Sequence, residues 1–150
     1  DNREMDINTT YNCIMGTTKH IGCAWSDPVH LAECFEMLHI VAGSEEAWRE
    51  RPFMSISCCH VVPPMKFTED ALNCLKLAVE GGMPVLLLSA GQSGATAPAC
   101  LAGAVAEAWA ECLGGLTYVN AIKPGSPAIL GTWPFVSDLR TGAMSGGSPE

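Results

Sequence analysis

The sequence alternates short apolar runs with helical patterns three times over, and this alternation limits the folds that the chain can adopt. Apolar runs at 11–15, 53–58, 85–89 and 128–131 predict four strands, and apolar residues recur at helical spacing between them. Strands that are separated by helical crossovers form parallel sheets. The chain is therefore predicted to be an α/β protein with about four parallel strands and intervening helices.

Capping residues indicate where the helices begin and end. Two helices are expected over 27–43 and 68–80, because each begins at an N-cap residue and ends at glycine. An Ala-rich helix is expected over 98–113, and it should break or change direction at Gly114 and Gly115.

The spacing of the strands fits half of a (β/α)8 barrel. An open, doubly wound sheet is the alternative, but the glycine fingerprints that favour it, G-x-G-x-x-G or a Walker loop, do not occur in the sequence. In such barrels functional residues lie at the carboxyl ends of the strands. Four polar, Gly-rich segments each follow a predicted strand here, so a partial TIM barrel is the predicted fold class.

Residues 1–150 are expected to form a single domain that is an internal fragment of a longer barrel. The chain starts with Asp1 rather than Met, and Ser148-Pro149-Glu150 has the pattern of a helix start. Half a barrel leaves a strand edge and apolar helix faces uncovered. Residues 1–150 alone are therefore expected to be poorly soluble.

Composition excludes two classes of partner. A net charge of −8 argues against nucleic acid, whose phosphates require a basic surface. No apolar run reaches the roughly 18 residues that a membrane-spanning helix needs. The eight cysteines lie partly within apolar helical patterns, where a free thiol acts as a small hydrophobe, so a reducing cytoplasm is the expected location.

Four segments at the ends of the predicted strands or just after them, together with the end of the chain, carry a family resemblance. They are GTTKH at 16–20, SISC at 55–58, QSGATAP at 92–98, GTWPFVSDLRTG at 131–142 and AMSGGSPE at 143–150. In this order they resemble the trimethylamine:corrinoid methyltransferase family, and the likeness covers nearly the whole chain. The last twenty residues are its most specific part.

The resemblance implies a TIM-barrel enzyme that moves a methyl group from trimethylamine or a quaternary amine, such as glycine betaine, to a Co(I) corrinoid. A separate small corrinoid protein would carry this cofactor. Family members tend to be oligomers, so a homo-oligomer is implied. Some members contain pyrrolysine and act on trimethylamine, and that position would lie beyond Glu150.

Two other functions stay open. The first is a non-catalytic barrel that binds methylated amines or betaines. The second is a zinc-dependent corrinoid methyltransferase, for which Cys58-Cys59-His60 would supply ligands. Adjacent cysteines point to opposite sides of an extended chain, and an amine needs no Lewis acid, so no bound metal is expected.

Two pairs of residues after the fourth predicted strand are candidates for binding substrate. Trp133 and Phe135 could bind a methylated cation through their ring faces, or they could only pack a loop onto the rim of the barrel. Arg140 could bind the carboxylate of a betaine or pair with Asp138, and Asp138 could instead face the cation. No catalytic residue is predicted.

Four further residues have weaker assignments. Gln92 and Thr96 could bind substrate, although Thr96 could instead cap the next helix. Lys19 and His20, placed after the first predicted strand, could bind the polar edge of the corrinoid. His30 lies in a predicted helix and is expected at the surface.

Overall fold

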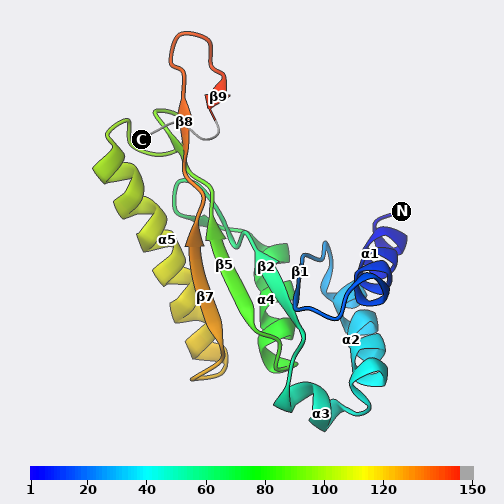
Figure 1. Ribbon diagram of the computed structural model, residues 1–150. Helices are drawn as coiled ribbons and strands as arrows, with labels where there is room; N and C mark the ends of the chain where they lie inside the picture. The colour runs from blue at the N-terminus through cyan, green and yellow to red at the C-terminus, as the bar shows by residue number, and fades with distance from the viewer. Residues whose placement is uncertain (146–150) are drawn as a thin grey trace.

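The computed structural model describes residues 1–145 (Figure 1). Five helices cover Asn2–Gly16 (α1), Pro28–Ala42 (α2), Glu45–Glu50 (α3), Glu69–Glu80 (α4) and Leu101–Ile122 (α5). The strands cover Ile21–Cys23 (β1), Met54–Cys58 (β2), Val61–Val62 (β3), Lys66–Phe67 (β4), Val85–Ser89 (β5), Gln92–Ser93 (β6), Ala128–Thr132 (β7), Phe135–Ser137 (β8) and Met144–Ser145 (β9).

A parallel four-stranded sheet in the order β1-β2-β5-β7 forms the centre of the fold. Neighbouring strands follow one another along the chain with helices between them, and α1 packs on α2, α2 on α4, and α4 on α5 (Figure 1). Val85 and Leu87 on β5 are buried in the core that the helices share, whereas Leu86 and Leu88, which point the other way, are partly exposed. The α/β class with parallel strands is confirmed.

Three of the four predicted strands are confirmed as β2, β5 and β7, but the first is wrong. Residues 11–15 lie in α1, whose amino end is capped by the Asp1 carboxylate, which accepts a hydrogen bond from the Glu4 N–H at 2.9 Å. Ile7, Thr10 and Ile14 recur at helical spacing and face the rest of the protein. The first strand is instead β1, too short and too rich in glycine to be recognised from the sequence.

All three predicted helices are present, but the break predicted in the third is wrong. Asp27 caps α2 by accepting from the Val29 N–H at 2.8 Å, and Gly43 ends it with a φ of 96°. Helix α4 follows Thr68 as expected. Helix α5, in contrast, runs through Gly114 and Gly115 without a break. The predicted helix start at 148–150 lies outside the described residues, and no described helix has the length and apolar character to cross a membrane.

A buried carboxylate joins α1 to the start of α2. Asp6 is 3% exposed and accepts hydrogen bonds from the Ser26 N–H at 3.0 Å, the Ser26 hydroxyl at 2.7 Å and His30 Nδ1 at 2.8 Å. His30 is thus half-buried in this cluster, and its expected place at the surface is wrong. Burial alone would raise the pKa of Asp6, but the hydrogen bonds from Ser26 and His30 outweigh it and lower that pKa.

This cluster predicts a pH-dependent loss of stability. Because the folded-state pKa of Asp6 is lowered, its ionised form stabilises the fold above the unfolded pKa, about 4, and this contribution is lost as the pH falls through the folded pKa. We expect Asp6→Asn to reduce the free energy of unfolding by about 1–3 kcal/mol at neutral pH. The difference from wild type should shrink on acidification.

Urea unfolding of the intact protein between neutral and acidic pH measures this difference. Glu36→Gln, at an exposed position on α2, is the control and should change little. A difference between Asp6→Asn and wild type that stays constant down to about pH 3 would contradict the prediction.

Candidate functional site

The carboxyl ends of β5 and β7 continue into a second, smaller sheet. Above them β6 pairs in parallel with β8, and β8 pairs with β9, so the chain projects beyond the main sheet (Figure 1). Two backbone hydrogen bonds join the segments that lead from the main sheet into the smaller one. Trp133 N–H donates to the Ser89 carbonyl at 2.7 Å, and Phe135 N–H donates to the Gly91 carbonyl at 3.0 Å. Trp133 and Phe135 are therefore tied by their backbones to the end of the neighbouring strand.

Trp133 and Phe135 form an aromatic pair at this edge. Their ring centroids are 5.6 Å apart and their planes are inclined by 31°. Trp133 is 64% exposed, and Phe135 is half-buried. An exposed indole face beside a second ring can bind a methylated cation, because both ring quadrupoles attract positive charge.

Gln92 lies beside this pair, since it is in register with Phe135 across β6 and β8. Its carbonyl accepts from the N–H groups of residues 95, 96 and 97, and its own N–H donates to Thr96 Oγ1 at 2.9 Å. These bonds fix the Gln92 backbone, while its side-chain amide has no hydrogen bond within residues 1–145. The prediction that Thr96 caps the next helix is wrong: Cys100 holds the N-cap position of α5.

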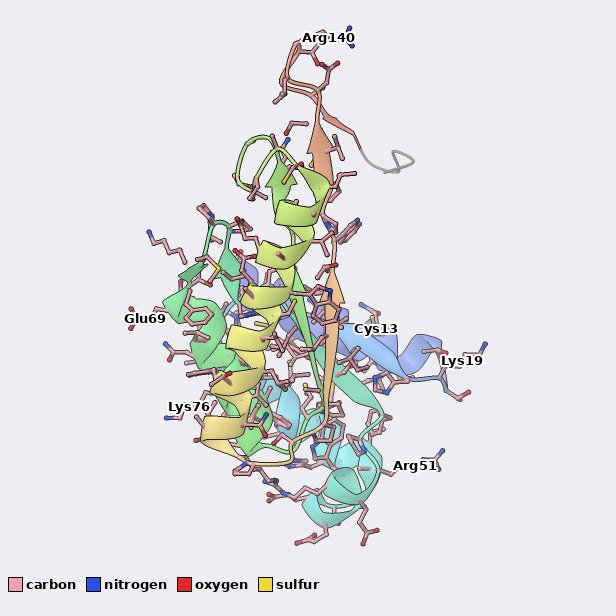
Figure 2. All side chains as sticks on the ribbon, turned by 90° about the vertical axis from the view of Figure 1, so that its left-hand side faces the viewer. Cys13, Lys19, Arg51, Glu69, Lys76 and Arg140 are labelled. Carbon is pink, nitrogen blue, oxygen red and sulfur yellow. The ribbon has the colours of Figure 1, made fainter. Side chains whose placement is uncertain are left out.

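Asp138 and Arg140 pair with each other in the turn between β8 and β9. The Asp138 carboxylate accepts from the Arg140 N–H at 2.9 Å, Nε at 3.3 Å and Nη2 at 3.4 Å. The Arg140 N–H, followed by its guanidinium, lowers the pKa of Asp138. Arg140 lies at the far tip of the molecule, 90% exposed, so the structure places it in the ion pair rather than beside the aromatic rings (Figure 2).

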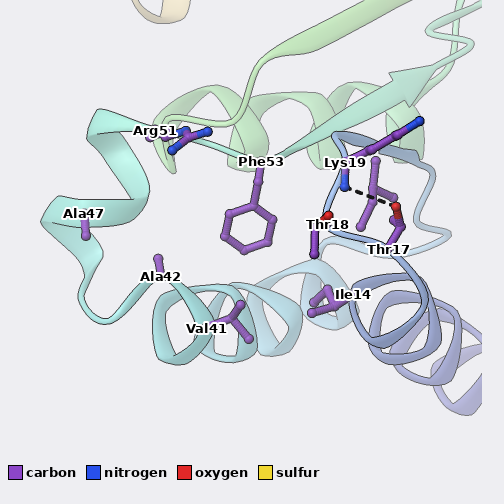
Figure 3. Close-up of a pocket in the computed structure, with 10 residues that line it drawn as sticks. Ile14, Thr17, Thr18, Lys19, Val41, Ala42, Ala47, Arg51 and Phe53 are labelled. Carbon is purple, nitrogen blue, oxygen red and sulfur yellow. Dashed lines mark hydrogen bonds between the residues drawn. The ribbon is translucent and has the colours of Figure 1, made fainter.

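Lys19 and His20 lie at the opposite edge of the sheet from the aromatic pair. Both precede β1 instead of following the first strand, and His20 Nε2 is 3.0 Å from the Ser55 hydroxyl at the amino end of β2. The placement on which their assignment depended is therefore wrong. Lys19 lines a pocket of about 570 Å³ with Arg51 and Phe53, and its side chain points away from Phe53 (Figure 3).

The side chains of Cys58, Cys59 and His60 lie in different environments, as expected for successive residues of an extended chain. Cys58 is buried, which raises the pKa of its thiol to about 12, whereas Cys59 is exposed. His60 is fully buried, and its Nε2 donates to the Glu111 carbonyl at 2.9 Å. Across residues 1–145 no group of three or more His, Cys, Asp or Glu side chains is placed to hold a metal ion.

Sequence reasoning missed one polar residue that the structure places under this edge. Glu111 is 2% exposed, and its carboxylate accepts from the Met65 N–H at 2.7 Å and from the Ser89 hydroxyl. A signal was present in the sequence, because Glu111 interrupts the otherwise small and apolar buried stripe that includes Ala104, Ala108 and Gly115 on α5.

The fold and this edge define a parallel α/β protein with a candidate binding site for a methylated cation at the carboxyl ends of its strands. The family model of trimethylamine methyltransferase (MTTB) matches residues 1–150. The chain belongs to this family.

Two relatives illustrate the similarity. The glycine betaine methyltransferase of Desulfitobacterium hafniense (strain Y51) is 33% identical over 144 residues, which are 96% of this chain and 28% of the relative. The proline betaine:corrinoid methyltransferase of Eubacterium limosum is 34% identical over 101 residues, 67% of this chain and 21% of the relative.

A third relative bears the family's own name. The trimethylamine methyltransferase MttB of Desulfitobacterium hafniense (strain DSM 10664 / DCB-2) is 30% identical over 134 residues, 89% of this chain and 27% of the relative. The chain thus spans less than a third of the length of these relatives.

Proposed function

We propose that the intact protein is a (β/α)8 barrel that transfers a methyl group from trimethylamine or a quaternary amine to the corrinoid of a partner protein in the cytoplasm. The observation that carries this proposal is the Trp133–Phe135 pair, which has the chemistry for a methylated cation at the carboxyl ends of parallel strands. Family membership and the names of the relatives support the same reaction class. Four consecutive parallel strands are consistent with half of such a barrel.

The chemistry explains why a cation site is needed. A methyl group leaves nitrogen readily only when the nitrogen is quaternary or protonated, because the amine then departs as a neutral base. The C–N bond breaks with its electron pair left on nitrogen, and the methyl carbon passes to the partner's corrinoid, whose Co(I) supplies the nucleophile. This chain has to bind the cation and leave its methyl group accessible.

Residues at the carboxyl edge can meet both requirements. Trp133 and Phe135 would hold the ammonium group, and the side-chain amide of Gln92, which has no partner within residues 1–145, could orient a polar substituent beside them. In (β/α)8 barrels the carboxyl ends of the strands form the open face, from which a corrinoid protein would approach. Lys19 and His20 could contact a corrinoid only at the other edge of the sheet, so they do not fit one that reaches a cation at Trp133.

The aromatic pair gives a direct test. We expect Trp133→Ala in the intact protein to weaken binding of glycine betaine and tetramethylammonium by about 2- to 30-fold, the range that a cation–π contact supplies. Trp133→Phe should retain most of the affinity, whereas Trp133→Leu should lose it although it stays apolar. Titration calorimetry measures these affinities.

A carbon isostere controls for simple apolar contact. The anion 3,3-dimethylbutanoate has the shape of glycine betaine without the positive charge, so it should bind weakly and be insensitive to Trp133→Leu. Equal binding of the two compounds would contradict a cation site. Transfer of labelled methyl from the amine to added corrinoid protein then separates a methyltransferase from a barrel that only binds methylated amines.

A further inference from the structure

Glu111 is buried and contacts two separate segments, the end of β5 and the β2–α4 loop. From α5 its carboxylate accepts from the Ser89 hydroxyl at the end of β5 and from the Met65 N–H in the β2–α4 loop, and its carbonyl accepts from His60. No Lys or Arg within residues 1–145 forms an ion pair with it.

A carboxylate at this position is costly for stability. Desolvation penalises a buried carboxylate, and two hydrogen bonds without a cation offset this penalty only in part. Its neighbours on the buried stripe of α5, Ala108 and Cys112, are small and apolar. An apolar residue would fill the position at lower cost, so the contacts of Glu111 suggest a role other than core packing.

Both contacts of the carboxylate lead to the backbone of the aromatic pair. Ser89 donates its hydroxyl hydrogen to Glu111, and its carbonyl accepts the Trp133 N–H at 2.7 Å. The loop that holds Met65 also lies against Gly91: a Cβ on Gly91 would be 3.9 Å from Pro63 Cβ. The Gly91 carbonyl in turn accepts the Phe135 N–H.

We propose that Glu111 is a positioning residue that sets the geometry of the Trp133–Phe135 pair through Ser89 and through the β2–α4 loop. The inference rests on the proposed function in that it takes the pair as the cation site. Glu111 itself is buried behind the sheet edge, so it would act through these contacts and not by binding the substrate directly. Its effect on binding is transmitted by two short chains of hydrogen bonds and contacts.

Hydrogen exchange tests the positioning role without reference to any substrate. In Glu111→Ala we expect exchange to rise about tenfold or more at the Met65, Trp133 and Phe135 amides, because the acceptor network that orders them is lost. Amides in β1 and α2 should change little. Ala108→Gly, which weakens α5 through helix propensity and the loss of one buried methyl group but leaves the hydrogen bonds of Glu111 in place, is the control for a general loss of stability. Exchange that rises equally in all elements, or equally in Ala108→Gly, would overturn the proposal.

Binding of glycine betaine and tetramethylammonium provides the second measurement. Glu111→Ala should weaken both by about tenfold, as loss of a buried acceptor displaces the groups that it held. Glu111→Gln retains a carbonyl oxygen for Met65 and a polar partner for Ser89, so it should restore most of the affinity. Ser89→Ala, which removes only one of the two hydrogen bonds to the Glu111 carboxylate, should have a smaller effect than Glu111→Ala. Affinity that is equally poor in Glu111→Gln and Glu111→Ala would contradict a geometric role.

The two proposals can fail separately. Absence of cation binding in the wild-type protein would reject the proposed function, while local exchange at Met65 and Trp133 would still report on Glu111. Normal cation binding in a folded Glu111→Ala variant would reject the positioning role and leave the cation site intact.

Discussion

Trp48→Ala is expected to lower the free energy of unfolding of the intact protein by about 3–5 kcal/mol, the usual cost of deleting a buried tryptophan. The Trp48 side chain is fully buried and packs edge-on against Phe35 and Phe53, with ring centroids 5.9 and 5.3 Å away. Its Nε1–H donates to the Gly81 carbonyl at 3.0 Å, which ties α3 to the end of α4. Removing the indole leaves a cavity between three elements and an unpaired carbonyl.

Urea unfolding compares this variant with two others. Trp48→Phe keeps most of the packing and loses the hydrogen bond, so it should cost about 1 kcal/mol from that bond, plus a smaller packing term. Glu50→Ala, at an exposed and charged position on the same helix α3, is the control and should change the free energy of unfolding little. A loss below about 1 kcal/mol for Trp48→Ala would contradict its place in the core.

Gly115→Ala is expected to destabilise the intact protein by about 1–3 kcal/mol, although alanine is normally the better helix former. A Cβ on Gly115 would overlap the ring of His60, which is buried and held by the Glu111 carbonyl. A Cβ on the neighbouring Gly114 would lie 3.1 Å from the Phe67 ring, which is a tight contact but a less severe one. Either the helix or the β2–α4 loop has to move to accept the methyl group.

A double-mutant cycle isolates the cause. His60→Ala removes the ring that the new methyl group would meet, so adding Gly115→Ala to His60→Ala should cost far less than adding it to wild type. Gly16→Ala, where no atom lies within 4 Å of the added Cβ, is the control and should be close to neutral. If Gly115→Ala stabilised the wild-type protein, the close contact with His60 would be disproved.

Much of the central sheet could be predicted because its signals are local. β2, β5 and β7 are apolar runs bounded by Pro, Gly or polar residues, and Asp27 and Gly43 have the capping chemistry that ends a helix. The proximity of Trp133 and Phe135 is also encoded locally, since residues two apart on an extended chain share a side.

Local signals failed where a contact between distant segments decides the structure. Residues 11–15 are apolar enough for a strand, but Trp25 donates to Thr10 and Ser26 donates to Asp6, which fix them in α1. This shift of the first strand also moves Lys19 and His20 to the amino edge. A period-two and a period-3.6 pattern cannot be told apart over five residues, so the partners of the segment decided it.

The sequence alone determined the class of fold, the parallel arrangement of the strands and the residue types available to bind a cation, because these depend on periodicity, capping and composition. Only the tertiary structure decided which of those residues meet. It paired Arg140 with Asp138, brought Gln92 beside Phe135, and linked the buried Glu111 to the Trp133 backbone through Ser89. Gly114 and Gly115, which predict a helix break from the sequence, instead leave space for the rings of Phe67 and His60, about 50 residues earlier in the chain. Such contacts depend on the register and the close approach of packed elements, which no local pattern specifies.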